Sequence, residues 1–139
     1  MTKRIDPEGL RHILDSIVAD WVREIGLELL EAKPGEVVLR LPVAAKHVHA
    51  GGVLCGQTMM AASDTAMVLA VTSHLGAFRP MTTVQLNTSF LRPVAGDSGE
   101  VRVVARVLRA GKSLVFGEIE LLDAQGKLAA HSMTTYALL

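Results

Sequence analysis

The chain of 139 residues contains a single cysteine, Cys55, so no disulfide can form within it. Its cysteine content therefore gives no reason to expect secretion. Lysine and arginine together equal aspartate and glutamate, which makes the formal net charge zero, and no run of basic residues is present. Nucleic acid is accordingly not an expected partner, because such proteins need a concentrated positive charge.

The sequence also lacks an uninterrupted apolar run of membrane-spanning length. Its most apolar stretch, residues 54–71, is broken by Gln57, Asp64 and several hydroxyl side chains, so we do not expect a membrane span. Residues 1–18 carry charges throughout and lack the apolar centre of a signal peptide. These absences predict a cytoplasmic protein with no membrane partner.

What is present is enough apolar sequence for a substantial core. Half of the residues are apolar and a fifth are charged, which predicts one folded domain over residues 1–139. A near-neutral, apolar chain of this size also favours a homo-oligomer, which hides part of its surface.

Apolar periodicity predicts a helix over residues 7–24, with Asp6 as its N-cap, Pro7 at its first position and Gly26 at its end. The apolar residues at helical spacing are Leu10, Ile13, Leu14, Ile17, Val18 and Trp21. The period then becomes that of a strand, and Pro34 and Gly35 mark a turn. A first hairpin of residues 27–32 and 36–43 follows from this pattern.

A second, longer helix is expected to begin at about Gly56 and to end at Gly76. Further strands are predicted over residues 82–91, 100–109, 113–122 and 128–138, arranged as an antiparallel meander. Because the long helix is apolar on nearly every face, the sheet must surround it. The predicted fold is α+β, with a six-stranded antiparallel sheet wrapped around a central helix and an N-terminal helix in addition.

Asp64 is the one charge in the long helix. The helical period places Gln57, Met60, Ala61, Asp64 and Val68 on one face. An ionised carboxylate is costly in a low-dielectric core unless it has a partner or water. Asp64 is therefore either a structural group bonded to a neighbouring segment, or a base or nucleophile that faces a cleft.

The loop before this helix is rich in glycine. Gly51, Gly52 and Gly56 permit close approach of the backbone, and the first N–H groups of the helix have no partner within it. Such a helix start can bind an oxyanion or polarise a carbonyl. A flexible loop of no function would have the same composition, and the phosphate-loop pattern GxxxxGK[ST] is absent.

The segment GGVLCGQTMMAASDTAMVLA resembles the signature of hotdog-fold acyl-CoA thioesterases of the phenylacetate-degradation type. That family shows roughly Asn-x-x-Gly-x-x-His-Gly-Gly, followed by an acidic residue within a helix. Gly52 and Gly56 match two of the glycines, Asp64 matches the acidic residue, and Thr83 stands where a Ser or Thr is frequent. The resemblance covers about Gly26 to the end of the chain and implies the hotdog fold and thioester hydrolysis.

Three positions depart from that pattern. Cys55 replaces the family histidine, His49 replaces the asparagine, and Gln57 replaces a glycine. A backbone donor does not depend on the side chain, so the Gly56 N–H can still polarise the thioester carbonyl. His49 can orient water or hold a proton near neutral pH. Cys55 has no evident activating base, and we interpret it as a small packing residue and not as the nucleophile.

The resemblance thus implies catalytic roles for Asp64, Gly56, His49 and Thr83. We expect further contacts to substrate from Gly52, Cys55, Gln57, Met60, Arg92, Arg109 and Lys112, the basic residues suiting phosphate groups. No metal site and no cofactor are expected, since His47 and His49 alone are too few ligands. An acyl-CoA is the expected substrate, bound between the subunits of a dimer or tetramer.

Two other functions stay open. The changed histidine and asparagine are compatible with an acyl-CoA-binding protein that has little or no turnover. A hotdog hydratase or dehydratase ranks below both, because its Asp/His pattern is not visible.

Overall fold

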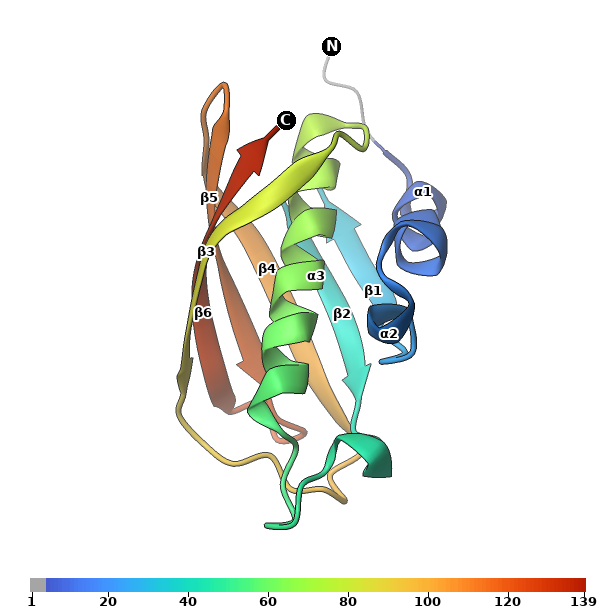
Figure 1. Cartoon of the computed structure of the whole chain (residues 1–139), viewed down its shortest axis with the longest axis vertical. Coiled ribbons are helices and arrows are strands. Elements are labelled where there is room, and N and C mark those ends of the chain that lie inside the picture. Colours follow the sequence, from blue (N-terminus) through green and yellow to red (C-terminus); the bar gives the residue numbers. More distant parts are fainter. Residues whose placement is uncertain (1–4) are drawn as a thin grey trace.

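The computed structural model describes residues 5–139, which contain one six-stranded sheet. The strands are β1 (Glu28–Lys33), β2 (Glu36–Pro42), β3 (Met81–Phe90), β4 (Glu100–Ala110), β5 (Leu114–Leu122) and β6 (Leu128–Leu138). All neighbours are antiparallel, in the order β1-β2-β4-β5-β6-β3. The sheet curves around helix α3 (Gly56–Leu75), as Figure 1 shows. The predicted α+β hotdog architecture is confirmed.

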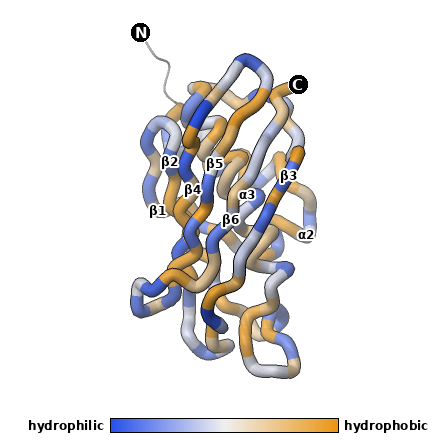
Figure 2. The backbone as a smooth tube through the Cα atoms, turned by 90° about the vertical axis from the view of Figure 1, so that its left-hand side faces the viewer, coloured by the Kyte–Doolittle hydropathy of each residue, from blue (hydrophilic) through white to orange (hydrophobic). Residues whose placement is uncertain are grey.

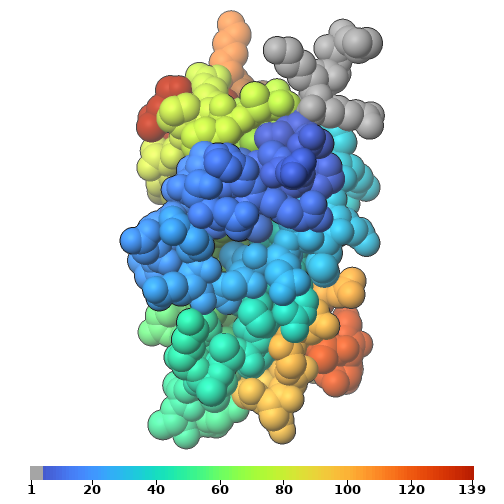
Figure 3. Space-filling model, turned by 90° about the vertical axis from the view of Figure 1, so that its right-hand side faces the viewer, coloured from blue at the N-terminus to red at the C-terminus, as the bar shows by residue number. Residues whose placement is uncertain are grey.

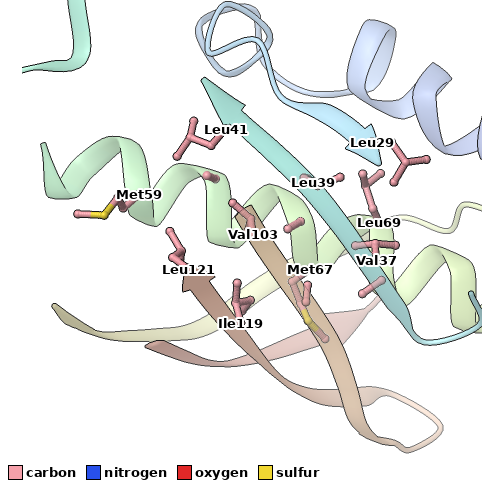
Figure 4. Packing of buried hydrophobic residues seen from close by; sticks show 14 of the residues in the cluster. Leu29, Val37, Leu39, Leu41, Met59, Met67, Leu69, Val103, Ile119 and Leu121 are labelled. Carbon is pink, nitrogen blue, oxygen red and sulfur yellow. The ribbon is translucent and has the colours of Figure 1, made fainter. Parts of the chain in front are cut away.

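Helix α3 forms the centre of the core. It runs for 20 residues and ends at Gly76, whose left-handed backbone (φ 83) is the predicted stop. Inward-facing residues of β2, β4 and β5 pack against it, including Leu39, Val103 and Ile119 (Figure 4). Met67 of α3 fills the space that a side chain at Gly117 would need. Among residues 5–139, no helix is both long and apolar enough to cross a membrane.

The first hairpin forms as predicted. β1 pairs with β2 through a turn at Pro34 and Gly35, and Gly35 adopts a positive φ of 80 that a residue with a side chain would rarely adopt. Alternate residues of β2 are fully buried, which matches the predicted strand period. A short 3-10 turn (Ala45–His47) then leads into the loop before α3.

The N-terminal helix is shorter than predicted. Helix α1 (Pro7–His12) leads into a π-helical turn (Ile13–Ile17), Val18 is extended, and α2 (Asp20–Arg23) follows. The expectation of one continuous helix over residues 7–24 was therefore wrong, although Asp6 caps α1 by accepting a hydrogen bond from the Gly9 N–H at 2.8 Å. Consecutive β-branched residues at Ile17 and Val18 favour helix weakly, and the extended Val18 turns the chain toward β1.

The break also divides the predicted apolar face. Leu10, Ile13 and Leu14 are buried, whereas Ile17 is 44% exposed and Trp21 is 62% exposed. Helix α1 contacts β1 and α3. Figure 3 shows that the N-terminal segment covers one side of the molecule. The first turns of the segment are buried in the core, and Val18 and Val22 further along are partly buried against it.

The predicted meander was also wrong in one respect. β4, β5 and β6 are consecutive neighbours, but β3 pairs with β6 and not with β4. The connection between β3 and β4 is too long for a tight hairpin and is bonded to other loops. The Leu54 N–H donates to the Val94 carbonyl, and the Gly96 N–H donates to the Gly52 carbonyl, each at 2.9 Å. This connection carries the chain past the start of α3, so that β3 becomes an edge strand (Figure 2).

Candidate functional site

Asp64 lies on the one strip of α3 that the rest of the chain leaves partly uncovered. Between residues 57 and 73, the residues that are not buried are Gln57, Met60, Ala61, Asp64 and Val68. These are the residues that the helical period placed on one face. The Asp64 carboxylate therefore borders accessible space and is not enclosed in the core, as a cleft-facing acid would be.

Two hydroxyl groups of the sheet donate hydrogen bonds to this carboxylate. Thr83 Oγ1 donates to Asp64 Oδ1 at 2.9 Å, and the Tyr136 hydroxyl donates to the same oxygen. The Tyr136 oxygen also lies 2.9 Å from the backbone carbonyl oxygen of Asp64. Thr83 and Tyr136 are register partners of β3 and β6, so both side chains point inward toward α3. The structure thus brings the predicted site residue Thr83 into contact with Asp64.

The local shape of β3 supports this arrangement. The β3–β6 register shifts between Thr83 and Gln85, which is a bulge with Val84 as the extra residue. Bulges bend a strand, re-aim side chains and are frequent beside functional sites. Here the bulge follows immediately after the residue that contacts Asp64.

Tyr136 is a permanent hydrogen-bond donor in this site. Burial and the adjacent Asp64 carboxylate raise the pKa of its phenol well above the ordinary value of 10.0, while the neighbouring Thr83 hydroxyl acts weakly in the opposite direction. The phenol consequently keeps its proton throughout the physiological pH range.

The start of α3 supplies free backbone donors. Gly56 is the first residue of the helix, and Cys55 at the N-cap position makes no capping bond with its side chain. Within the described chain, the N–H groups of residues 56–58 have no acceptor. A Cβ at Gly56 would lie 3.1 Å from the Phe90 ring, so a side chain there would displace this ring. Gly56 thus combines a backbone N–H without an acceptor with a backbone that lies close against Phe90.

An apolar cavity of about 270 Å³ adjoins this helix start. Its lining comes from the loop before α3, the first turn of α3, the end of β3 and the residues that follow β3, and consists of Val53, Leu54, Gly56, Met59, Phe90, Leu91, Arg92 and Pro93. Arg92, a predicted substrate contact, is exposed and lies in this lining. The cavity thus combines apolar walls, one cation and the free N–H of Gly56.

The loop before α3 is a folded turn and not a random connection. The Gly52 N–H donates to the His49 carbonyl at 2.9 Å, and the Gly51 N–H donates to His49 Nδ1 at 2.9 Å. Gly52 has a positive φ of 80 and open space around it, and the Cys55 Sγ lies 3.0 Å from Thr58 Oγ1. The His49 ring is exposed and has Nδ1 engaged as an acceptor, which leaves its Nε2 for a ligand or water.

A single chain does not bring all predicted site residues together. Asp64 follows Gly56 by eight residues along a straight helix, which separates them by about 12 Å. Arg109 and Lys112 are exposed at the β4–β5 hairpin, at the opposite end of the molecule from the loop before α3 (Figure 1). Gln57 and Met60 lie on the accessible strip between Gly56 and Asp64. Within one chain, the helix start and the Asp64 carboxylate are therefore two separate groups.

Tyr136 is the site residue that sequence reasoning missed. The strand period places Tyr136 on the inward face of residues 128–138, and a buried tyrosine needs a partner for its hydroxyl. That signal was available in the sequence. The partner of the hydroxyl could not be identified from the sequence, because the predicted meander separated residues 128–138 from the strand that carries Thr83. Among residues 5–139, no three His, Cys, Asp or Glu side chains are grouped as a metal site would require.

Comparisons with known proteins agree with this geometry. The family model of the thioesterase superfamily matches residues 51–130, which include the helix start, Asp64 and Thr83. Human acyl-coenzyme A thioesterase 13 is 29% identical, with 92% of this chain and 93% of that protein covered. The conserved protein PA5202 from Pseudomonas aeruginosa has a TM-score of 0.82 at 33% identity, covering 90% of this chain and 98% of that one. The E. coli PaaI protein from the phenylacetic acid degradation operon has a TM-score of 0.83 at 20% identity, covering 95% and 91%, and so shares the fold.

Proposed function

This chain belongs to the thioesterase superfamily, and we propose that it hydrolyses the thioester of an acyl-CoA to the free acid and CoA. The acyl group we expect is small or medium in size, with aromatic groups included. The observation that carries the proposal is the Asp64 carboxylate, which is held by two hydroxyls yet lies on the accessible strip of α3. The name of the human relative supplies acyl-CoA as the substrate class.

In this mechanism the thioester carbonyl oxygen accepts a hydrogen bond from the Gly56 N–H at the start of α3. The positive end of the helix and its free N–H groups stabilise the negative charge that develops on this oxygen. The apolar cavity beside Phe90 offers room for an uncharged part of the substrate, and Arg92 suits a phosphate group at its edge. These features support binding of a molecule with an apolar and an anionic end.

Asp64 supplies the reacting carboxylate in one of two ways. As a general base it takes a proton from water while the water oxygen bonds to the carbonyl carbon, after which the C–S bond breaks and the thiolate gains a proton. As a nucleophile it bonds to the carbonyl carbon, the C–S bond breaks and the leaving thiolate gains a proton from solvent, and water then cleaves the resulting anhydride. Thr83 holds the carboxylate in both cases, and His49 or Gln57 can position the water.

We further propose that each complete site forms between two subunits. β3 is an edge strand with exposed apolar side chains, among them Val84 at 59%, and an unpaired edge of this kind is suited to strand pairing. Pairing of β3 with a second β3 would continue the sheet across a dimer. It would also let the helix start of one chain approach Asp64 of the other. The dimer, a tetramer built from it, a cytoplasmic location and the single domain over residues 1–139 stay predictions.

The experiment that tests the function is a thiol-release assay over a panel of aliphatic and aromatic acyl-CoAs. We expect turnover, with thioesters of N-acetylcysteamine as a control that keeps the acyl group and lacks the nucleotide. A higher kcat/KM for the CoA ester would show recognition of the nucleotide portion. Tight binding of acyl-CoA without thiol release would instead support the acyl-CoA-binding protein and overturn the hydrolase.

Replacement of Cys55 by Ala is expected to retain most of the activity, within about threefold in kcat. Its thiol lies against Thr58 Oγ1, and the group useful for catalysis at this turn is the adjacent backbone. Treatment of the wild type with a thiol-alkylating reagent and thiol-release kinetics of Cys55→Ala check this expectation. Loss of turnover in the variant would assign the nucleophile to Cys55.

A further inference from the structure

Tyr136 has a role in the proposed reaction that the family resemblance did not supply. Resting on the function proposed above, we infer that Tyr136 is a positioning residue that acts through Asp64. Together with Thr83 it fixes Oδ1 of the carboxylate, and it thereby leaves Oδ2 as the oxygen that reacts.

The two carboxylate oxygens of Asp64 have different surroundings. Both hydroxyl donors contact Oδ1, and no donor of residues 5–139 contacts Oδ2. The buried polar side-chain atoms without a partner in this part of the chain are His47 Nδ1 and Thr72 Oγ1, so Oδ2 keeps accessible surface. Oδ2 therefore meets the requirement for a base or nucleophile, which is a lone pair that faces the substrate and not the protein.

Tyr136 is better suited than Thr83 to fix the carboxylate. Its side chain is 2% exposed, and its strand β6 lies between β5 and β3 in the sheet. Thr83 belongs to the edge strand and sits beside a bulge. A donor held from an interior strand by a packed ring has little freedom, and the small displacements that positioning prevents can cost large factors in rate.

The position of the Tyr136 hydroxyl also fits a carboxylate whose charge changes during the reaction. The hydroxyl has one proton and two acceptors in reach, the Oδ1 atom and the backbone carbonyl of Asp64. The ionised carboxylate is the stronger acceptor. When Oδ2 gains a proton or a bond to carbon, the phenol can donate to the carbonyl, so neither state leaves a buried donor without a partner.

The first test compares Tyr136→Phe with a matched control, Thr134→Val. Thr134 is a buried neighbour on the same face of β6, and its hydroxyl donates to the Gln85 carbonyl at 2.8 Å without touching Asp64. Each variant loses one buried hydroxyl. We expect both to lower the Tm by roughly 3–6 °C. Only Tyr136→Phe should lower kcat, by about 10- to 100-fold, with KM within about threefold. An unchanged kcat in Tyr136→Phe would overturn the inference.

A double-mutant cycle then asks whether Tyr136 acts through Asp64. In the Asp64→Asn background, Tyr136→Phe should change the residual rate by less than about twofold, because the group it positions is already gone. If the two substitutions multiply their separate effects on kcat, Tyr136 acts independently of Asp64 and the assignment fails.

A spectroscopic measurement distinguishes failure of this inference from failure of the proposed function. Tyr136 is the only tyrosine of the chain, so the tyrosine band in near-ultraviolet difference spectra reports on its hydroxyl alone. The phenol donates to an ionised acceptor in the wild type and to a neutral one in Asp64→Asn, so we expect the variant's band to shift to shorter wavelength at neutral pH, where both proteins are folded. If the wild type releases no thiol from any acyl-CoA, the proposed function fails and this band still tests the contact between Tyr136 and Asp64. An unchanged band would overturn the inference.

Discussion

Replacement of Asp64 by Asn is expected to lower kcat for thioester hydrolysis by ~10²–10⁴-fold, the usual loss when a positioned base is removed. Asn has nearly the same volume and one acceptor oxygen, so it can still accept hydrogen bonds from Thr83 and Tyr136. It can neither take a proton nor form an anhydride. We expect the free energy of unfolding to change by no more than about 1 kcal/mol, since the side chain is only partly buried.

The measurements are thiol release, acyl-CoA binding and thermal unfolding for the wild type and Asp64→Asn. Asp15→Asn, an exposed acid in the N-terminal π-helical turn, is the matched control and should behave as the wild type. A variant that binds acyl-CoA, stays folded and keeps the wild-type kcat would remove Asp64 from the reaction. If Asp64 were a structural group only, the Tm would fall first and the activity would follow it.

Asp64 could be found from the sequence because its position depends on one local rule. The period of 3.6 residues placed Gln57, Met60, Ala61, Asp64 and Val68 on one face, and the structure leaves that face accessible. The hairpin of β1 and β2 and the bounds of the strands also depend mainly on the local sequence. Turn residues and alternation determine them with little help from the rest of the chain.

The features that could not be predicted depend on contacts between distant segments. The pairing of β3 with β6 follows from a connection that is bonded to the loop before α3, and single-residue patterns do not contain that information. The contact between Tyr136 and Asp64 depends on this pairing and was missed with it. The break at Val18 has a similar origin: the apolar spacing continues to Trp21, but the chain after the break turns Trp21 to the surface and packs Val22 against the core.

The proposal that each site combines the helix start of one chain with Asp64 of another leads to the second large effect. Gly56→Pro is designed to remove the proposed carbonyl donor while keeping the helix, because proline is tolerated at the first helical position. Cys55 already has the extended backbone (φ −71, ψ 147) that a residue before proline needs. Gly56→Ala keeps the N–H and adds only the Cβ beside Phe90, so it is the matched control. We expect Gly56→Pro to lower kcat by ~10²–10³-fold and Gly56→Ala to lower it far less.

Asp64→Asn and Gly56→Pro should each be nearly inactive alone and should recover activity when co-refolded in equal amounts. If the site combines Gly56 of one chain with Asp64 of its partner, each mixed dimer has one intact site and one site with both changes. Random association makes half of the dimers mixed, which restores about a quarter of the wild-type activity per chain.

Light scattering should give at least a dimeric mass for the two variants and for their mixture. A monomeric mass at micromolar concentration, or a mixture no more active than its two components, would show that Gly56 of one chain does not combine with Asp64 of another. In that case the roughly 12 Å between them along α3 would rule out their joint action on one thioester.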